Sequence, residues 1–313
     1  MTTRRTFIKK SLMGTTALSM PMYFGACTSD KQIELPKISL AQWSLNRAIR
    51  KGEIKPEDFA AITKNTYGLD AVEYVATFYL DQKYNAAYWG DLKKRSDSEG
   101  VNNLLIMIDE QGDLGAADED TRLEAVDDHK VWVDNAASLG CHSIRVNAFG
   151  AEDRQTIKAA LVDGLGDLCD YGSQAGINII IENHGLYSSD ADFIVEVIKE
   201  VDSPFMGTLP DFGNWCTSVK WGVTSDDSCE TVYNQVKGVK EFMPYNRGVS
   251  AKTYDFNAQG GQDRVDFKAI LQVVKDHGFD GYIGIEYEGN NLSEEEGIKA
   301  TKALIHSTWA ELH

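Results

Sequence analysis

The decapeptide Gly-Ile-Asn-Ile-Ile-Ile-Glu-Asn-His-Gly, residues 176–185, decides the fold class. Its first glycine is suited to the left-handed turn that ends a helix. The isoleucine run that follows predicts a strand buried on both faces, as in a parallel sheet. Glu182, Asn183 and His184 stand at the carboxyl end of this strand. Because a buried acid and imidazole are costly unless they pair or bind something, we expect Glu182 to lie at the mouth of a ring of such strands.

The same helix–glycine–strand unit recurs along the chain at five glycines, and the first four are spaced by about the length of one βα unit. These glycines are Gly68, Gly100, Gly140, Gly176 and Gly278. Strands are predicted at residues 38–43, 71–75, 103–108, 143–147, 177–182, 206–211, 248–252 and 282–286. Amphipathic helices between them predict a single-domain (β/α)8 TIM barrel over residues 37–313. A doubly wound open sheet is the competing fold, and the lack of a glycine-rich dinucleotide fingerprint after the first strand disfavours it.

Composition limits the partners of the chain. It has 313 residues and a formal net charge of −17. Phosphate binding needs clustered Lys and Arg, so this charge argues against a nucleic-acid partner. It also disfavours docking on anionic lipid through a basic face.

The first 27 residues have the layout of an export signal. Arg4 and Arg5 form a twin arginine, and a modestly apolar stretch follows at residues 12–24. Small residues before Cys27 resemble a lipoprotein cleavage site, and the alternative is a simple signal peptide cut near Ala26. We expect an exported periplasmic or outer-envelope lipoprotein that meets the membrane only through a lipid on Cys27, with residues 28–36 as a tether.

Four further cysteines remain in the chain, and they show no CxxC or zinc-type spacing. Cys216 and Cys229 lie in one predicted loop region, residues 212–240, and are the only pair considered for a disulfide. We expect free buried thiols at all four positions, which include Cys141 and Cys169.

Acidic residues stand near the carboxyl ends of four predicted strands. They are Glu73, Glu182, Asp211 and Glu286. In a barrel these strand ends converge on one face, where the acids repel each other unless a cation or proton sits among them. Oxygen-rich ligands favour Mn²⁺ or Mg²⁺, or Zn²⁺ if a His joins. Glu73 is expected to be a structural partner rather than a catalyst.

Several motifs together resemble the xylose-isomerase-like TIM barrels, usually labelled sugar phosphate isomerases/epimerases. The motifs are Ile-Glu-Asn-His-Gly at 181–185, Pro-Asp-Phe-Gly-Asn at 210–214 and Gly-Ile-Glu-Tyr-Glu-Gly at 284–289. Segments 40–45 and 251–256 fit as well. The resemblance covers nearly all of residues 38–310 and is specific for the superfamily, but it says little about the substrate.

The resemblance implies a divalent metal held by Glu, Asp, His and Glu on the last four strands. Glu182, Asp211 and Glu286 match three of these ligands. Ser250 stands where the family's His would be. This departure leaves two readings: water, Glu288 or His184 completes the shell, or the metal is weak or absent.

The resemblance also implies the chemistry. Glu182 and Glu286 match the acid/base pair that moves a proton next to a sugar carbonyl while the metal polarises it. The outcome is epimerisation, isomerisation or β-elimination. Because phosphorylated sugars are chiefly cytoplasmic, export favours a non-phosphorylated sugar or keto-glycoside.

Other side chains at the predicted strand ends are candidate substrate contacts. They are Trp43, Arg145, His184, Asn214, Lys252 and Glu288. For Lys252 a salt bridge to Glu286 is the competing interpretation, and for Arg145 it is packing.

Two other functions compete with a sugar isomerase, epimerase or lyase. One is a non-catalytic carbohydrate-binding lipoprotein, which fits the missing histidine. The other is a three-zinc endonuclease, which the six histidines and the net charge of −17 oppose. The sugar and the oligomeric state stay open.

Overall fold

The computed structural model describes residues 34–223 and 229–312, and within them eight parallel strands form one sheet. The strands are β1 (Lys37–Ala41), β2 (Ala71–Val75), β3 (Asn102–Met107), β4 (Ser143–Val146), β5 (Asn178–Glu182), β6 (Met206–Leu209), β7 (Val249–Thr253) and β8 (Tyr282–Tyr287). The expected signal, with Cys27, lies outside the described residues, as does most of the tether.

The sheet follows chain order from β6 back to β1 and continues through β8 to β7. Two isolated parallel bridges, Thr208 to Asn246 and Asp211 to Ser250, then join the β6 and β7 sides. The backbone N–H of Ser250 donates to the Pro210 carbonyl (2.9 Å), and that of Phe212 donates to the Ser250 carbonyl (3.0 Å). The predicted (β/α)8 barrel is confirmed, and its ring closes beside Asp211.

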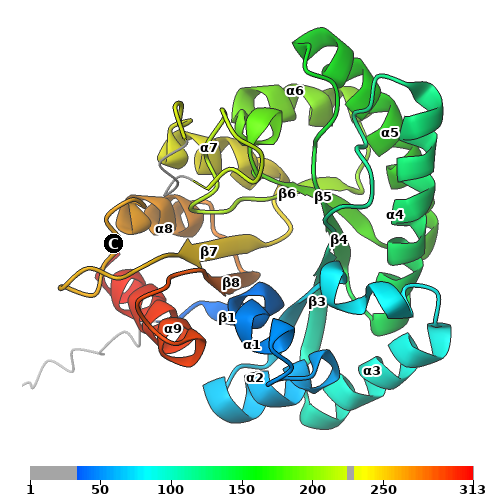
Figure 1. Ribbon diagram of the computed structural model, residues 1–313. Coiled ribbons are helices and arrows are strands. Elements are labelled where there is room, and N and C mark those ends of the chain that lie inside the picture. The colour runs from blue at the N-terminus through cyan, green and yellow to red at the C-terminus, as the bar shows by residue number, and fades with distance from the viewer. Residues whose placement is uncertain (1–33, 224–228, 313) are drawn as a thin grey trace, which may run out of the picture. The chain divides into compact units, whose positions relative to one another are not determined.

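Helices lie outside the ring of strands (Figure 1). They are α1 (Asn46–Arg50), α2 (Phe59–Tyr67), α3 (Ala86–Glu99), α4 (Glu119–Leu139), α5 (Arg154–Ala175), α6 (Ala191–Val201), α7 (Gln235–Phe242), α8 (Phe267–Asp276) and α9 (Glu294–Glu311). Within the described ranges, no helix has the length and apolar character needed to span a membrane.

Local sequence explains where these helices begin and end. Gly68, Gly100, Gly140 and Gly176 each adopt the left-handed conformation that ends a helix, at φ of 63°, 63°, 81° and 71°. Ser293 begins α9 with a capping box, in which its hydroxyl accepts from the Glu296 N–H. Two predicted strands end two residues earlier than expected: Gln42 begins a 3-10 turn (Gln42–Leu45) after β1, and β6 stops before Pro210, which has no N–H to donate.

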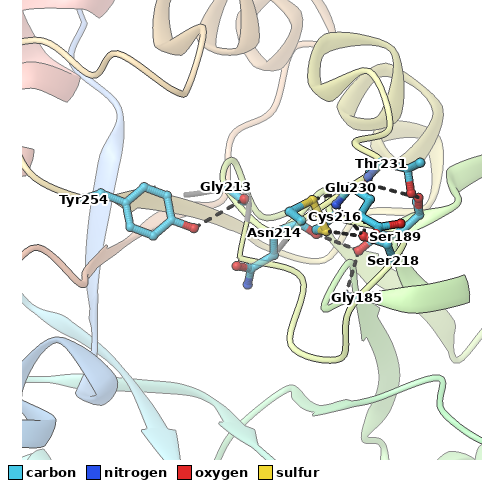
Figure 2. Close-up of a disulfide and its surroundings, with 11 residues drawn as sticks. Gly185, Ser189, Gly213, Asn214, Cys216, Ser218, Glu230, Thr231 and Tyr254 are labelled. Carbon is cyan, nitrogen blue, oxygen red and sulfur yellow. Dashed lines mark hydrogen bonds between the residues drawn. A yellow bond between two sulfur atoms is a disulfide. The ribbon is translucent and has the colours of Figure 1, made fainter. Parts of the chain in front are cut away.

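A long loop between β6 and α7 contains a disulfide between Cys216 and Cys229 (Figure 2). The expectation of free thiols at these two positions is therefore wrong, because the loop folds back on itself and pairs Cys216 with Val232 in an antiparallel bridge. Cys141 and Cys169 are free and buried, as predicted.

The same loop packs closely on the loop that follows β5. Gly185 pairs with Lys220, and the Leu186 N–H donates to the Val219 carbonyl (3.2 Å). A Cβ on Gly185 would overlap the backbone of the β6 loop, and a Cβ on Gly222 would overlap Gly185. The two loops therefore touch backbone to backbone.

We predict that reduction of the disulfide destabilises the protein. The bond joins residues 13 positions apart, and closing a loop of that size contributes about 3 kcal/mol through the unfolded chain. Urea unfolding of the wild type should show this loss when reductant is added. The Cys216→Ala/Cys229→Ala variant should start at the lower stability and be indifferent to reductant; a reductant effect that persists in the variant would assign it elsewhere.

Candidate functional site

Three carboxylates meet at the carboxyl ends of the strands. Glu182 ends β5, Asp211 follows β6 and Glu286 lies on β8. One ligand atom from each lies within 4.8 Å of the other two, and all three side chains are buried. Three negative charges this close in a buried place need protons or cations between them. The structure thus brings together the three residues named as metal ligands from the sequence.

Ser250 occupies the place where the sequence resemblance implied a fourth ligand. Its hydroxyl lies 2.6 Å from Asp211 Oδ2 and 3.2 Å from Glu286 Oε2, and its single proton serves one of them at a time. The backbone N–H groups of Gly213 and Asn214 donate to Asp211 Oδ1 at 2.7 and 2.8 Å. Ser250 therefore links two of the three acids and adds another oxygen to the group.

Arg145, on β4, faces Glu182 from one side. Its Nε lies 2.7 Å from Glu182 Oε2, yet the angles do not make a hydrogen bond, and neither atom has another hydrogen-bond partner. We therefore treat the contact as a close charge pair rather than a hydrogen bond. The Glu182 oxygen keeps its lone pairs available, which suits a carboxylate that receives a cation.

Lys252, on β7, faces Glu286 from the other side. Its Nζ lies 3.1 Å from Glu286 Oε1 and 3.4 Å from Glu288 Oε2. It also donates to Asn214 Oδ1 (3.3 Å), and the Asn214 amide donates to Glu182 Oε1 (3.2 Å). The salt bridge weighed for Lys252 is thus present, and Asn214 is fully buried behind the carboxylates.

Burial and crowding change the protonation of the triad. Burial, reinforced by Glu286 and Asp211 and opposed by Arg145, raises the pKa of Glu182 well above its usual value. Burial and Glu286, opposed by Lys252, raise the pKa of Asp211 to about 7. The metal-free triad therefore holds protons near neutral pH. Its oxygen ligands and its excess negative charge fit a divalent cation, which would take the place of those protons.

A cavity of about 320 Å³ opens beside the triad. Its lining residues are Trp43, Arg50, Val75, Thr77, Met107, Asp109, Glu110, Arg145, His184, Trp221, Val223, Lys252, Glu286 and Glu288. Of the six candidate substrate contacts, five line this cavity, and Asn214 is the exception. This volume is at the small end of the range for small-molecule sites.

His184 borders the cavity as a neutral ring. Burial, with a contribution from Arg145, lowers its pKa well below the usual value. Its Nδ1 lies 2.8 Å from Asn147 Oδ1, and its ring meets the Trp221 ring at a centroid distance of 5.1 Å. His184 is therefore an uncharged hydrogen-bonding group in the wall.

Trp43 and Glu288 also line the cavity. The Trp43 indole N–H donates to Glu288 Oε1, and the Arg50 guanidinium lies 5.0 Å from the Trp43 ring centroid. The Glu288 backbone N–H donates to the Thr253 carbonyl (2.8 Å). Glu288 is thus fixed by its neighbours at the rim, and its second oxygen faces Lys252.

Sequence reasoning missed Asp109, which accepts from Arg145 Nη1 (2.6 Å) and from the Asn147 amide (2.8 Å). Although burial opposes it, the charge and the hydrogen bond of Arg145 hold the pKa of Asp109 below its usual range. The signal was present, since Asp109 directly follows the predicted strand 103–108. Trp221 was also missed, and its φ of 72° is rare outside glycine. No local sequence pattern predicts that Trp221 lines the cavity.

Glu73 lies deeper in the barrel. Ser39 donates to its Oε1 (2.6 Å), and its Oε2 has no hydrogen-bond partner. A Cβ on Gly284 would come 2.5 Å from Glu73 Oε1, so this glycine makes room for the acid. Burial raises the pKa of Glu73 to about 7 against the opposing Ser39 hydrogen bond, which keeps the side chain largely protonated below neutral pH.

We predict that Glu73 makes the protein less stable as the pH rises. The unfolded chain ionises this acid above about pH 4.5, whereas the folded chain holds its proton to about pH 7. Stability is therefore lost across that window, by roughly 3 kcal/mol. Urea unfolding with EDTA at pH 4.5 and 7.5 should show a smaller drop for Glu73→Gln than for the wild type. The exposed Glu53→Gln should behave as the wild type, and parallel curves for all three proteins would refute the assignment.

The chain belongs to the xylose isomerase-like TIM barrel family, whose sequence profile matches residues 63–307. No curated protein sequence matches the chain. Similar solved structures share the fold at low identity. One is 3-keto-D-glucoside 4-epimerase YcjR from E. coli, at 14% identity and a TM-score of 0.63, covering 81% of this chain and 94% of that one.

Two further structures are similar over most of their length. A D-psicose 3-epimerase in the presence of D-fructose has 14% identity and a TM-score of 0.62, covering 87% of this chain and 99% of that one. The IOLI protein with a bound zinc atom has 16% identity and a TM-score of 0.64, covering 88% and 99%. Sugar epimerases and a metal-bound barrel are thus among the structural neighbours.

Proposed function

We propose that this chain is a sugar isomerase or epimerase, or a related lyase, that removes a proton next to a carbonyl with the help of a divalent metal. The observation that carries the proposal is the group of buried carboxylates Glu182, Asp211 and Glu286 beside a cavity. Membership of the xylose isomerase-like family and the sugar epimerases among its structural neighbours support the same chemistry.

Glu182, Asp211 and Glu286 are the residues that would hold the metal. Their all-oxygen ligand set favours Mn²⁺ or Mg²⁺, and a neighbouring structure with zinc keeps Zn²⁺ as an alternative. When bound, the cation polarises a carbonyl and makes the adjacent C–H more acidic.

Glu182 and Glu286 move the proton. One of them takes it from the carbon next to the carbonyl, and the electron pair of the C–H bond shifts towards the carbonyl oxygen. Return of a proton to the opposite face gives the epimer, and return to the neighbouring carbon gives the isomer. Loss of a β-leaving group instead cleaves the substrate. Lys252, beside Glu286 at the cavity wall, supplies a positive charge close to these steps.

The charge of the cavity favours a neutral substrate. Four acidic residues line it, Asp109, Glu110, Glu286 and Glu288, and two more acids of the triad lie beside it. These six acids outnumber the three basic residues of the lining and the two charges of the proposed cation together. Two of the basic residues, Arg145 and Lys252, are already paired with carboxylates. A phosphate group would meet net repulsion here, so the proposed substrate is a non-phosphorylated sugar or keto-glycoside.

Export fits the same substrate class. The twin arginine and Cys27 support a protein carried to the periplasm or outer envelope and anchored there by lipid. The disulfide formed by Cys216 also supports an oxidising compartment.

A non-catalytic carbohydrate-binding protein is the second candidate. Arg145 and Lys252 already neutralise part of the charge on Glu182 and Glu286, and Ser250 offers only a weak ligand to a metal. A site built this way binds a sugar without moving a proton.

Exchange of C–H for deuterium separates the two candidates. Neutral ketoses and keto-glycosides are incubated with the protein in D₂O, with Mn²⁺ or with EDTA, and followed by NMR. We expect exchange at the carbon next to the carbonyl, stimulated by Mn²⁺. Glu182→Gln and Glu286→Gln should each reduce its rate by about 10²–10⁴-fold.

The matched control is Glu124→Gln, an exposed acid on α4, which should exchange at the wild-type rate. Saturable sugar binding without any exchange would favour the binding protein. Exchange that survives both triad substitutions would remove these carboxylates from the reaction.

A further inference from the structure

We propose that Lys252 competes with the divalent metal for Glu286 and moves to Glu288 when the metal binds. The inference rests on the metal site of the proposed function and adds how its occupancy is controlled. Glu288 is thereby a receiving partner for the lysine rather than only a wall of the cavity.

The competition follows from a shared carboxylate. Glu286 belongs to the acidic triad, and its Oε1 lies 3.1 Å from Lys252 Nζ. A divalent cation binds carboxylate oxygen at about 2.0–2.6 Å. An ammonium group and a doubly charged ion held by the same small group repel each other strongly in a buried site. The ion pair with Glu286 and the bound metal therefore oppose one another.

Lys252 is almost entirely buried, with 2% of its side chain exposed, so its charge needs a carboxylate partner. It does have a second partner, because Glu288 Oε2 lies 3.4 Å from the same Nζ. The ammonium group already lies between the two carboxylates, at similar distances from both. A small movement of Nζ therefore transfers the ion pair from Glu286 to Glu288.

Glu288 is built to receive this charge. Its Oε1 accepts from the Trp43 indole, and its backbone N–H is tied to Thr253. These contacts fix the carboxylate at the rim and leave Oε2 directed at Lys252. Glu288 therefore offsets part of the cost of moving Lys252 away from Glu286.

The two side chains then have opposite effects on metal affinity. Without Lys252, the metal has no competitor at Glu286 and should bind more tightly. Without the charge of Glu288, the ammonium has only Glu286 and the metal should bind more weakly. A purely structural role for either residue, or simple electrostatic attraction of the metal by nearby acids, does not predict that the effect of Glu288 depends on Lys252.

The experiment is a titration of the metal-free protein with Mn²⁺, read by the EPR signal of free Mn²⁺ and by calorimetry. We expect Lys252→Met to lower the Kd by about tenfold and Glu288→Gln to raise it several-fold, typical of coupled sites. In the double variant the Glu288 substitution should have little further effect. If Lys252→Met is poorly folded, the decrease in affinity of Glu288→Gln and its absence in a Lys252→Gln background carry the same test.

Lys220→Met is the control for charge alone. Lys220 pairs with Asp113 at 3.9 Å and is about half exposed, so its removal should leave the Kd within about twofold of the wild type. Equal gains in Lys252→Met and Lys220→Met, or a Glu288 effect that is unchanged without Lys252, would overturn the proposal.

Failure to bind Mn²⁺ in the wild type and every variant would also overturn it. That result would also remove the metal from the proposed function, whereas deuterium exchange in EDTA would still report proton transfer by the carboxylates alone. Tight binding with the expected signs but no exchange would support the role of Lys252 and remove the proposed activity.

Discussion

Closure of the barrel between β6 and β7 is the constraint on which the site depends. The ring closes through the backbone bridge of Asp211 and Ser250. The Ser250 hydroxyl then donates to the Asp211 carboxylate, which belongs to the acidic triad. Glu182 and Glu286 come from the strands on either side of this closure. Without this closure the sheet would stay open. The acids from the β5 and β6 side and the acid from β8 would then lie towards separate edges. The backbone pairing of the ring therefore fixes the carboxylates close together, and protons or cations must offset their repulsion.

Positive charges in the barrel divide the work of compensating these acids. Arg145 serves Glu182 and Asp109 from β4, and Lys252 serves the β8 side. Each of the two cations is shared by two carboxylates, so none of these four acids is neutralised completely. The site therefore keeps net negative charge, on which both the proposed divalent cation and the proposed non-phosphorylated substrate rest.

Much of the barrel could be predicted from the sequence because its signals are local. Buried strands such as 177–182 and helix-ending glycines such as Gly176 can be recognised within a few residues. The triad followed from one global rule, that strand ends converge, and Asp109 was accessible to the same rule. Trp221 and the Cys216–Cys229 bond were not, because they depend on how a long loop folds back over residues far from it.

The backbone contact between Gly185 and Gly222 joins the loop that carries His184 to the loop that carries Trp221. Neither glycine accepts a side chain at the contact, so substitutions there would displace the backbone that carries His184 and Trp221. Relatives with a different substrate are then expected to vary elsewhere around the cavity, where Arg50 at the end of α1 and Thr77 in the 3-10 turn after β2 line it. Diversification of this pocket is in that sense one-sided.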